Sequence, residues 1–113
     1  ARSYRAKARV QKRLRRVLDA GDPADALYRA IIGYIADKFD LPEAGMTSSD
    51  VRDLFEGRAI TQAASAHLLD ILRTSERARY AGETLSRGAV EPLLQSAQES
   101  MEQLDLWLRK GSR

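Results

Sequence analysis

Hydrophobic residues recur at helical spacing through most of the chain, and no segment shows the strict alternation that is typical of a β-strand. The first periodic segment covers residues 4–18, and we expect Gly21 to follow its end in the left-handed conformation. This segment has one narrow apolar stripe, which consists of Ala6, Val10, Leu14 and Val17. The pattern therefore predicts an amphipathic helix at the start of the chain.

A second helix is predicted to begin at Asp22-Pro23, because aspartate caps helix N-termini and proline suits the first helical position. We expect it to end in the segment Asp40-Leu41-Pro42, since a residue that precedes proline avoids the α region. Gly33 inside this helix predicts a close helix crossing at that point. The apolar face of the helix consists of Leu27, Tyr28, Ile31, Ile35 and Phe39.

The third predicted helix has the most distinct start in the chain. Thr47 and Asp50 have the spacing of an N-cap and a third helical residue that bond each other's backbone. The helix is expected over residues 48–56, and Gly57 is expected to stop it, because glycine readily adopts the backbone conformations that end helices.

Two longer helices complete the prediction. The fourth covers residues 62–80, and the fifth is expected to start near Ala89, because Pro92 belongs in the first turn of a helix. The whole pattern predicts an all-α fold, a compact bundle of about five helices with a basic N-terminal helix. At 113 residues the chain is expected to form one domain.

Positive charge is concentrated at the N-terminal end. The first eighteen residues carry eight basic side chains and no acidic one, whereas the rest of the chain carries 11 basic and 16 acidic side chains. The formal charge of +3 therefore combines a cationic arm, residues 1–18, with a mildly acidic helical body, residues 19–113. The basic residues of the arm are Arg2, Arg5, Lys7, Arg9, Lys12, Arg13, Arg15 and Arg16.

Three interpretations of the cationic arm are open. It is a solvated helix whose arginines pair with the acidic body, a juxtamembrane segment beside anionic lipid, or a nucleic-acid-binding segment. The chain has no apolar run long enough to span a bilayer. Because it begins with Ala1, we expect that an upstream part has been removed and that the arm is the point where this domain joined a larger protein. In the membrane interpretation the residues expected to contact lipid headgroups are Arg5, Arg9, Lys12 and Arg16.

Sequence-specific recognition of nucleic acid is not favoured by the pattern. Residues 48–72 have helix-turn-helix proportions, yet the would-be recognition helix carries no Arg, Lys or Asn before Arg73. Tyr4 is the one aromatic residue of the arm, whereas single-strand binding uses several stacked aromatic rings. A nonspecific nucleic-acid-binding helical module that uses the basic N-terminal helix is therefore the alternative function.

The sequence contains no catalytic or metal-binding motif. Cysteine is absent and His67 is the single histidine, so sites built from thiolates or histidine clusters are excluded. Asp37, Asp40 and Glu43 lie close in sequence, but their spacing matches no calcium loop. We therefore predict a non-enzymatic protein without a cofactor and without a small-molecule substrate.

The end of the fourth predicted helix is the candidate site for a protein partner. Arg77, Arg79 and Tyr80 are of residue types that are enriched at protein interfaces. Tyr80 is expected either to pack under the following loop as an anchor or to contact a partner. The partner would enter a groove between the fourth and fifth helices.

Several short segments, taken in order over residues 5–104, resemble a known family. A basic helix leads into Asp-Pro-Ala, two tyrosine-containing motifs follow in the second helix, and further motifs mark the third and fourth helices. These segments are Leu27-Tyr28-Arg29-Ala30, Tyr34-Ile35-Ala36-Asp37, Leu41-Pro42, Met46-Thr47 and Arg79-Tyr80-Ala81-Gly82. The chain resembles the carboxyl-terminal cytoplasmic domain of the BatD (oxygen-tolerance, aerotolerance) family.

The resemblance implies a bacterial envelope protein with an exported part, one spanning helix and this helical domain at the cytoplasmic face of the inner membrane. It implies a membrane-anchored protein-interaction domain that is linked to oxygen tolerance and stress. Its implied protein partners are von Willebrand A-domain proteins or a MoxR-type ATPase, which are encoded beside the family. The family supplies no catalytic residue.

Overall fold

The computed structural model describes residues 2–110 of the chain, and in this range it contains five α-helices, one short 3₁₀ helix and no strand. The predicted all-α bundle is therefore confirmed. Its principal extents are 39 × 25 × 25 Å. The elements are α1 (Arg2–Leu14), η1 (Val17–Asp19), α2 (Pro23–Phe39), α3 (Ser48–Gly57), α4 (Gln62–Tyr80) and α5 (Arg87–Arg109).

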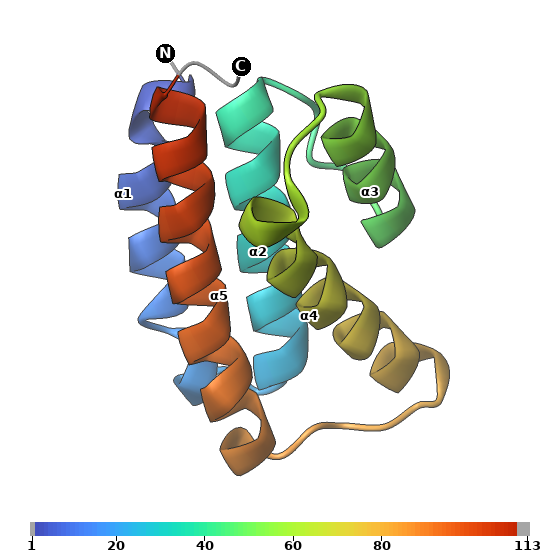
Figure 1. Ribbon diagram of the computed structural model, residues 1–113. Helices are drawn as coiled ribbons and strands as arrows, with labels where there is room; N and C mark the ends of the chain where they lie inside the picture. The colour runs from blue at the N-terminus through green and yellow to red at the C-terminus, as the bar shows by residue number, and fades with distance from the viewer. Residues whose placement is uncertain (1, 111–113) are drawn as a thin grey trace.

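Three helices run along the long axis of the bundle and two cross its side. Figure 1 shows α1, α2 and α5 roughly aligned, with α2 running antiparallel to α1 and both chain ends at one end of the bundle. Helix α4 crosses obliquely and packs against α2 and α5, while α3 packs against α4. The most extensive packing joins α1 to α2, so the cationic arm is an integral part of the bundle.

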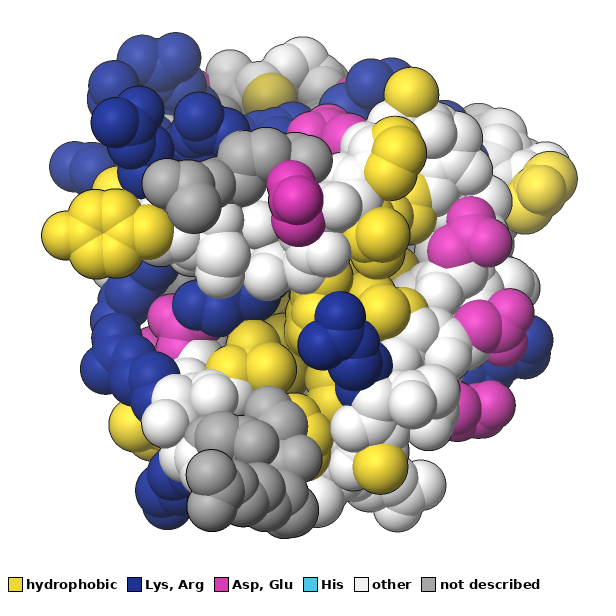
Figure 2. Space-filling view, turned by 90° about the horizontal axis from the view of Figure 1, so that it is seen from above, with side chains coloured by type: hydrophobic (Ala, Val, Ile, Leu, Met, Phe, Trp, Pro, Cys, Tyr) yellow, Lys and Arg dark blue, Asp and Glu magenta, His cyan; other side chains and the backbone are white. Residues whose placement is uncertain are grey.

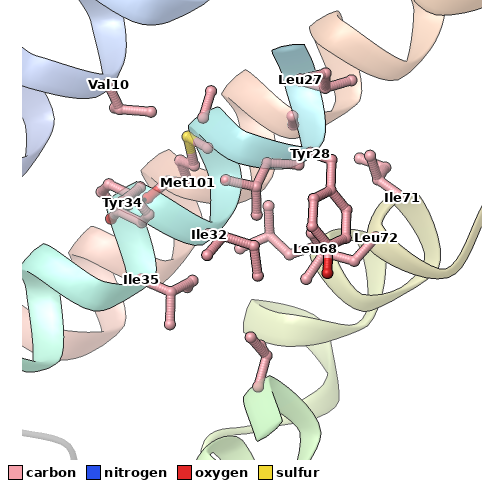
Figure 3. Packing of buried hydrophobic residues seen from close by; sticks show 14 of the residues in the cluster. Val10, Leu27, Tyr28, Ile32, Tyr34, Ile35, Leu68, Ile71, Leu72 and Met101 are labelled. Atoms are coloured by element: carbon pink, nitrogen blue, oxygen red, sulfur yellow. Dashed lines mark hydrogen bonds between the residues drawn. The ribbon is translucent and has the colours of Figure 1, made fainter. Parts of the chain in front are cut away.

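Helix α2 lies at the centre and is buried on nearly all sides. It contributes eleven buried residues, far more than the single face that the sequence pattern predicted. A helix that is apolar all round needs neighbours on every side, and α1, α4 and α5 provide them. Figure 3 shows Tyr34 beside Met101 on one side of α2, and Tyr28 near Ile71 and Leu72 on the other.

The end of the first helix differs from the prediction. Helix α1 stops at Leu14, and the Arg16 N–H bonds the Arg13 carbonyl oxygen at 3.1 Å as the chain tightens into η1. This turn still places Val17 in the core, with 1% of its surface exposed. Gly21 does not adopt a positive φ, so the predicted left-handed terminator is wrong.

The predicted starts of α2 and α3 and the predicted end of α2 are confirmed, whereas the end of α3 differs in detail. The Asp22 side chain caps α2, and Thr47 and Asp50 form the predicted reciprocal capping box of α3. Helix α2 ends at Phe39, and its C-cap Asp40 is left-handed with φ 55°. The left-handed turn after α3 is made by Ala59 with φ 54°, whereas Gly57 is the last helical residue.

Helix α5 starts two residues before the predicted position. The Ser86 hydroxyl accepts a hydrogen bond from the Ala89 N–H at 3.1 Å, and this cap fixes the start at Arg87. Pro92 therefore lies inside the helix, where it removes a bond to the Gly88 carbonyl. Gly88 is exposed, so water is available to that carbonyl.

Candidate functional site

The four arm residues expected to contact lipid lie on one side of the bundle. Arg5, Arg9 and Lys12 are spaced by four and three residues, which places them on one stripe of α1, and Arg16 follows in the turn after the helix ends at Leu14. All four side chains are exposed. Figure 2, which views the end that carries both termini, shows Lys and Arg side chains gathered at the left, where α1 lies in Figure 1. We call these four residues the basic stripe.

Three residues of the basic stripe have no acidic partner within residues 2–110. These are Arg5, Lys12 and Arg16, for which the described part of the structure contains no ion pair. Arg9 differs, because its Nη1 lies 3.4 Å from Asp37 Oδ1 on α2. The basic stripe therefore combines one paired guanidinium with three charges that only solvent or a binding partner can neutralise.

Other cations of the arm pair with the acidic body. Lys7 Nζ lies 3.9 Å from a carboxylate oxygen of Glu102 on α5, and Arg13 Nη1 lies 3.6 Å from Glu43 Oε1. Exposed pairs of this kind contribute about 0–1 kcal/mol each. The pairing expected for a solvated arm is thus present for part of the charge.

Arg13 occupies a position that the sequence interpretation did not assign to any site. A Cβ built on Gly33 of α2 would overlap the Arg13 guanidinium, so this glycine leaves the space in which the guanidinium lies. The predicted close approach at Gly33 therefore involves an arginine side chain and not a second helix backbone. An unexplained glycine inside the second helix was the sequence signal for this arrangement.

A hollow of about 320 Å³ follows the contact between α1 and α2, and we call it the seam hollow. Arg9, Lys12 and Arg16 of the basic stripe line it together with Arg13 and Gly33. The structure thus brings three of the four predicted stripe residues to one depression, and Arg5 lies one helical turn before it.

A second polar cluster centres on Glu76 of α4. Its Oε2 accepts hydrogen bonds from the Tyr28 hydroxyl at 2.7 Å and from the Ser48 N–H at 3.0 Å, while its Oε1 accepts from the Ser48 hydroxyl at 2.5 Å. Ser48 is the first residue of α3, so the carboxylate lies at the positive end of that helix. The Glu76 cluster thereby ties α2, α3 and α4 together.

The hydrogen bonds set the charge state of the Glu76 cluster. Burial acts to raise the pKa of Glu76, but the hydroxyl and N–H of Ser48, the Tyr28 hydroxyl and the charge of Arg79 together hold it below its ordinary value. Burial, and then the Glu76 carboxylate, raise the pKa of Tyr28. The cluster therefore holds Glu76 as a carboxylate near neutral pH, with three neutral donors bonded to it.

Arg79 and Tyr80 line a broad hollow of about 1070 Å³ beside the Glu76 cluster. This groove lies between α2, the α2–α3 connection and the end of α4, not between α4 and α5 as expected. The Arg79 guanidinium lies 5.1 Å from the centre of the Tyr28 ring. Tyr80 is 93% exposed, so the expectation that it packs under the loop is wrong.

Arg77, the third predicted partner-binding residue, does not line this groove. Its Nη2 donates to the Thr74 hydroxyl at 3.4 Å on the exposed side of α4. The structure therefore brings two of the three predicted residues together and leaves the third apart.

Buried polar residues also join α2 to α5. Asp105, which is 4% exposed, accepts a hydrogen bond from the Tyr34 hydroxyl and lies 3.0 Å from Lys38 Nζ. Burial, and then this carboxylate, raise the pKa of Tyr34. Opposite charge and hydrogen bonding compensate the buried carboxylate, which suits a structural cross-link between helices.

The described residues offer no grouping for metal chemistry. His67 is exposed on α4, and residues 2–110 contain no cluster of three or more potential His, Asp or Glu ligands. Within the same range, no helix has the length and apolar character needed to cross a bilayer.

Comparison of the chain with protein-family models, curated proteins and solved structures finds no match.

Proposed function

We propose that this chain is a non-enzymatic helical interaction domain that lies against an anionic membrane surface through the basic stripe of α1. In this proposal the groove beside Arg79 and Tyr80 receives a protein partner. The resemblance to the BatD family leads us to propose further that the domain is tethered at the cytoplasmic face of the bacterial inner membrane. A role in oxygen tolerance, with von Willebrand A-domain proteins or a MoxR-type ATPase as partners, belongs to the same proposal.

The observation that carries the proposal is the set of three unpaired cations, Arg5, Lys12 and Arg16. Arg5 and Lys12 are exposed along one side of α1, whose opposite side is packed on α2, and Arg16 is exposed in the turn that follows the helix. Packing fixes their relative positions, so binding to a charged surface costs little ordering of the backbone. Each basic residue near anionic lipid contributes about 1 kcal/mol to binding, and the contributions of one stripe act together.

The arrangement of the arm favours binding to an anionic membrane surface over binding to single-stranded nucleic acid or recognition of a base sequence. Tyr4 is 90% exposed at the start of α1, where an aromatic ring suits the headgroup region. No second aromatic ring accompanies it on the arm for stacking on nucleobases. Duplex nucleic acid shares the negative charge of a membrane, and we use it as the competing ligand in the test below.

The proposed protein site rests on exposure and composition. Tyr80 and the Arg79 guanidinium stand at the rim of the large groove, and Ile32 and Met46 supply apolar lining. Exposed Tyr and Arg beside a partly apolar hollow are typical of the anchor points of protein interfaces.

The test is co-sedimentation with vesicles of phosphatidylcholine alone and of phosphatidylcholine mixed with phosphatidylglycerol, beside titration with duplex DNA at the same salt. We expect binding to the anionic vesicles only, and weakening with added salt because surface charges are screened. Absence of binding to anionic vesicles would overturn the membrane proposal. Tighter binding to the duplex than to the vesicles would instead support the alternative nucleic-acid-binding module.

A further inference from the structure

The seam hollow has an excess of positive charge over negative charge. Of the described residues that line it, four are cations, namely Arg9 and Lys12 together with Arg13 and Arg16, and two are carboxylates. Asp37 lies 3.4 Å from Arg9 and Glu43 lies 3.6 Å from Arg13, and these described lining residues together carry a local excess of two positive charges. Such an excess over a small concave area attracts a compact ligand of two negative charges.

The floor of the seam hollow is shaped for the Arg13 guanidinium. Gly33 has no side chain, and the planar guanidinium lies in the space that a Cβ would take. The Glu43 carboxylate lies 3.6 Å from the same guanidinium and pairs with it beside Gly33. An arginine that is held in place presents its planar set of N–H donors with less loss of side-chain freedom on binding.

We propose that the seam hollow binds the phosphomonoester dianion of a membrane lipid headgroup, of the kind that phosphatidic acid carries. This inference rests on the proposed membrane function and names the headgroup chemistry within it. A phosphomonoester carries about −1.5 to −2 charge near neutral pH and three terminal oxygens, which matches both the charge excess and the forked donors of Arg13. A phosphodiester headgroup has one negative charge and fewer free oxygens, so it fills the site less well.

The same chemistry is available in soluble form, so the test includes a phosphomonoester without lipid. Lys12 and Arg16 belong both to the hollow and to the basic stripe, so a headgroup bound here lies on the face that we propose to contact the membrane. Glycerol 3-phosphate provides the same dianion without the bilayer. Comparison of the two ligands separates a site that needs the membrane surface from a site for free phosphomonoesters.

Gly33→Ala is the main test variant. The atom nearest to the new methyl group is the tip of the Arg13 side chain, which can move aside, and alanine favours the helix more than glycine does. The variant should therefore fold and displace the guanidinium, together with a small shift of the Glu43 carboxylate, whose Oε1 lies 3.1 Å from the new methyl position. Gly88→Ala is the matched control, because it also adds a methyl group to a helical glycine but in open space.

A second pair of variants tests the shape of the cation at constant charge. Arg13→Lys keeps the positive charge but removes the planar fork of donors. Arg15→Lys is the control, since Arg15 is exposed nearby and does not line the seam hollow.

The experiment compares binding to vesicles with equal fractions of phosphatidic acid or phosphatidylglycerol, beside NMR titration with glycerol 3-phosphate. We expect about fivefold tighter binding to phosphatidic acid, the effect of one further charge. Gly33→Ala and Arg13→Lys should abolish this preference, and both controls should retain it. A change in the NMR chemical shift of the Gly33 amide on addition of glycerol 3-phosphate would show that the seam hollow also binds a soluble phosphomonoester.

Two outcomes would overturn the inference. Equal wild-type binding to both acidic lipids, without a Gly33 shift, would mean that the hollow does not select phosphomonoesters, while the proposed membrane function would stand. Retention of the preference in Gly33→Ala would place the selectivity elsewhere on the chain. Failure to bind either acidic vesicle is a different result, because it would refute the membrane function itself.

Discussion

The two sides of helix α2 handle charge in opposite ways. Towards α3 and α4, the Glu76 carboxylate is surrounded by donors from Ser48 and Tyr28, and each donor is satisfied. Towards α1, the seam hollow gathers more cations than carboxylates, and Lys12 and Arg16 have no acidic partner within residues 2–110. One side therefore resembles a closed structural network, whereas the other has charge left over for a ligand.

This difference separates stability from binding. Removal of one group from a satisfied network leaves its partners without a hydrogen bond, which lowers the free energy of unfolding. Removal of an exposed cation that has no ion pair leaves no other group of the protein unpaired. It should therefore change the free energy of unfolding little and weaken the binding of a ligand that neutralised the cation. The two sides of α2 should consequently respond to mutation in different assays, and the following variants test that separation.

The largest effect is expected for the triple variant Arg5→Gln/Lys12→Gln/Arg16→Gln. Loss of three cations at about 1 kcal/mol each should weaken binding to anionic vesicles about 100-fold. The free energy of unfolding should change little, because none of the three has an ion pair in the described structure. Vesicle co-sedimentation and urea unfolding measure the two quantities.

The matched control for this variant is Arg52→Gln/Arg73→Gln/Arg77→Gln, which removes the same charge from α3 and α4. If the control weakens vesicle binding as much as the α1 variant, net charge governs binding and the basic stripe has no special role.

The next largest effect is expected for Glu76→Ala, on the other side of α2. Loss of the carboxylate leaves the Ser48 N–H and hydroxyl without this acceptor, and it leaves the Tyr28 hydroxyl with the longer 3.5 Å contact to the Met46 carbonyl. We expect a loss of about 2 kcal/mol of stability, because hydrogen bonds to a charged group are among the stronger ones. Urea unfolding followed by Trp107 fluorescence measures it.

Vesicle binding by folded Glu76→Ala should equal that of the wild type. Glu83→Ala is the stability control, because Glu83 is an exposed glutamate after the same helix, and it should change stability by less than about 0.5 kcal/mol. A similar loss in both variants would refute the structural role of the Glu76 cluster.

A smaller effect on the free energy of unfolding is expected when the pH is lowered. The folded state holds the pKa of Glu76 below its ordinary value of 4.5, so the unfolded chain takes up this proton first as the pH falls. The stabilisation from Glu76 is thus complete above the unfolded pKa and is lost as the pH falls from there through the folded pKa. Urea midpoints measured below about pH 5 should decline more steeply in the wild type than in Glu76→Ala. If the urea midpoints of the wild type and of Glu76→Ala fall equally with pH, Glu76 is not the group whose protonation destabilises the fold.

The smallest effect on stability is expected for Tyr80→Ala. Its ring is 93% exposed, so truncation should change the free energy of unfolding by less than about 0.5 kcal/mol. The Arg79→Ala/Tyr80→Ala variant should nevertheless lose capture of von Willebrand A-domain or MoxR-type partners in a pull-down. A folded double variant that retains every partner captured by the wild type would remove the support for this groove.

Local sequence patterns predicted the fold well, because caps and periodicity act over a few residues. The capping box of Thr47 and Asp50 is one example, and the start at Asp22-Pro23 is another. The failures at helix ends have a local cause as well. The left-handed turn after α3 falls on Ala59 and not on Gly57, and Gly21 does not adopt a positive φ, so residue type alone misplaced both.

The clusters at the sites could be predicted only in part, because they join residues that are distant in sequence. Glu76 bonds Ser48, 28 residues away, and Tyr28, 48 residues away, and no local pattern encodes such pairs. The spacing of the basic stripe was readable from helical geometry, whereas its division into paired and unpaired cations required the position of α2. Gly33 marked the seam hollow in the sequence without naming Arg13 as its neighbour.

The most direct test of the central claim asks which surface of the domain touches lipid. Anionic vesicles that carry a spin-labelled headgroup broaden the NMR signals of amides close to the membrane. We predict broadening concentrated in residues 5–16, on the side of the basic stripe, with the amides of α3 and α4 unaffected. Broadening centred on α3 or α4, or spread evenly over the bundle, would contradict the account.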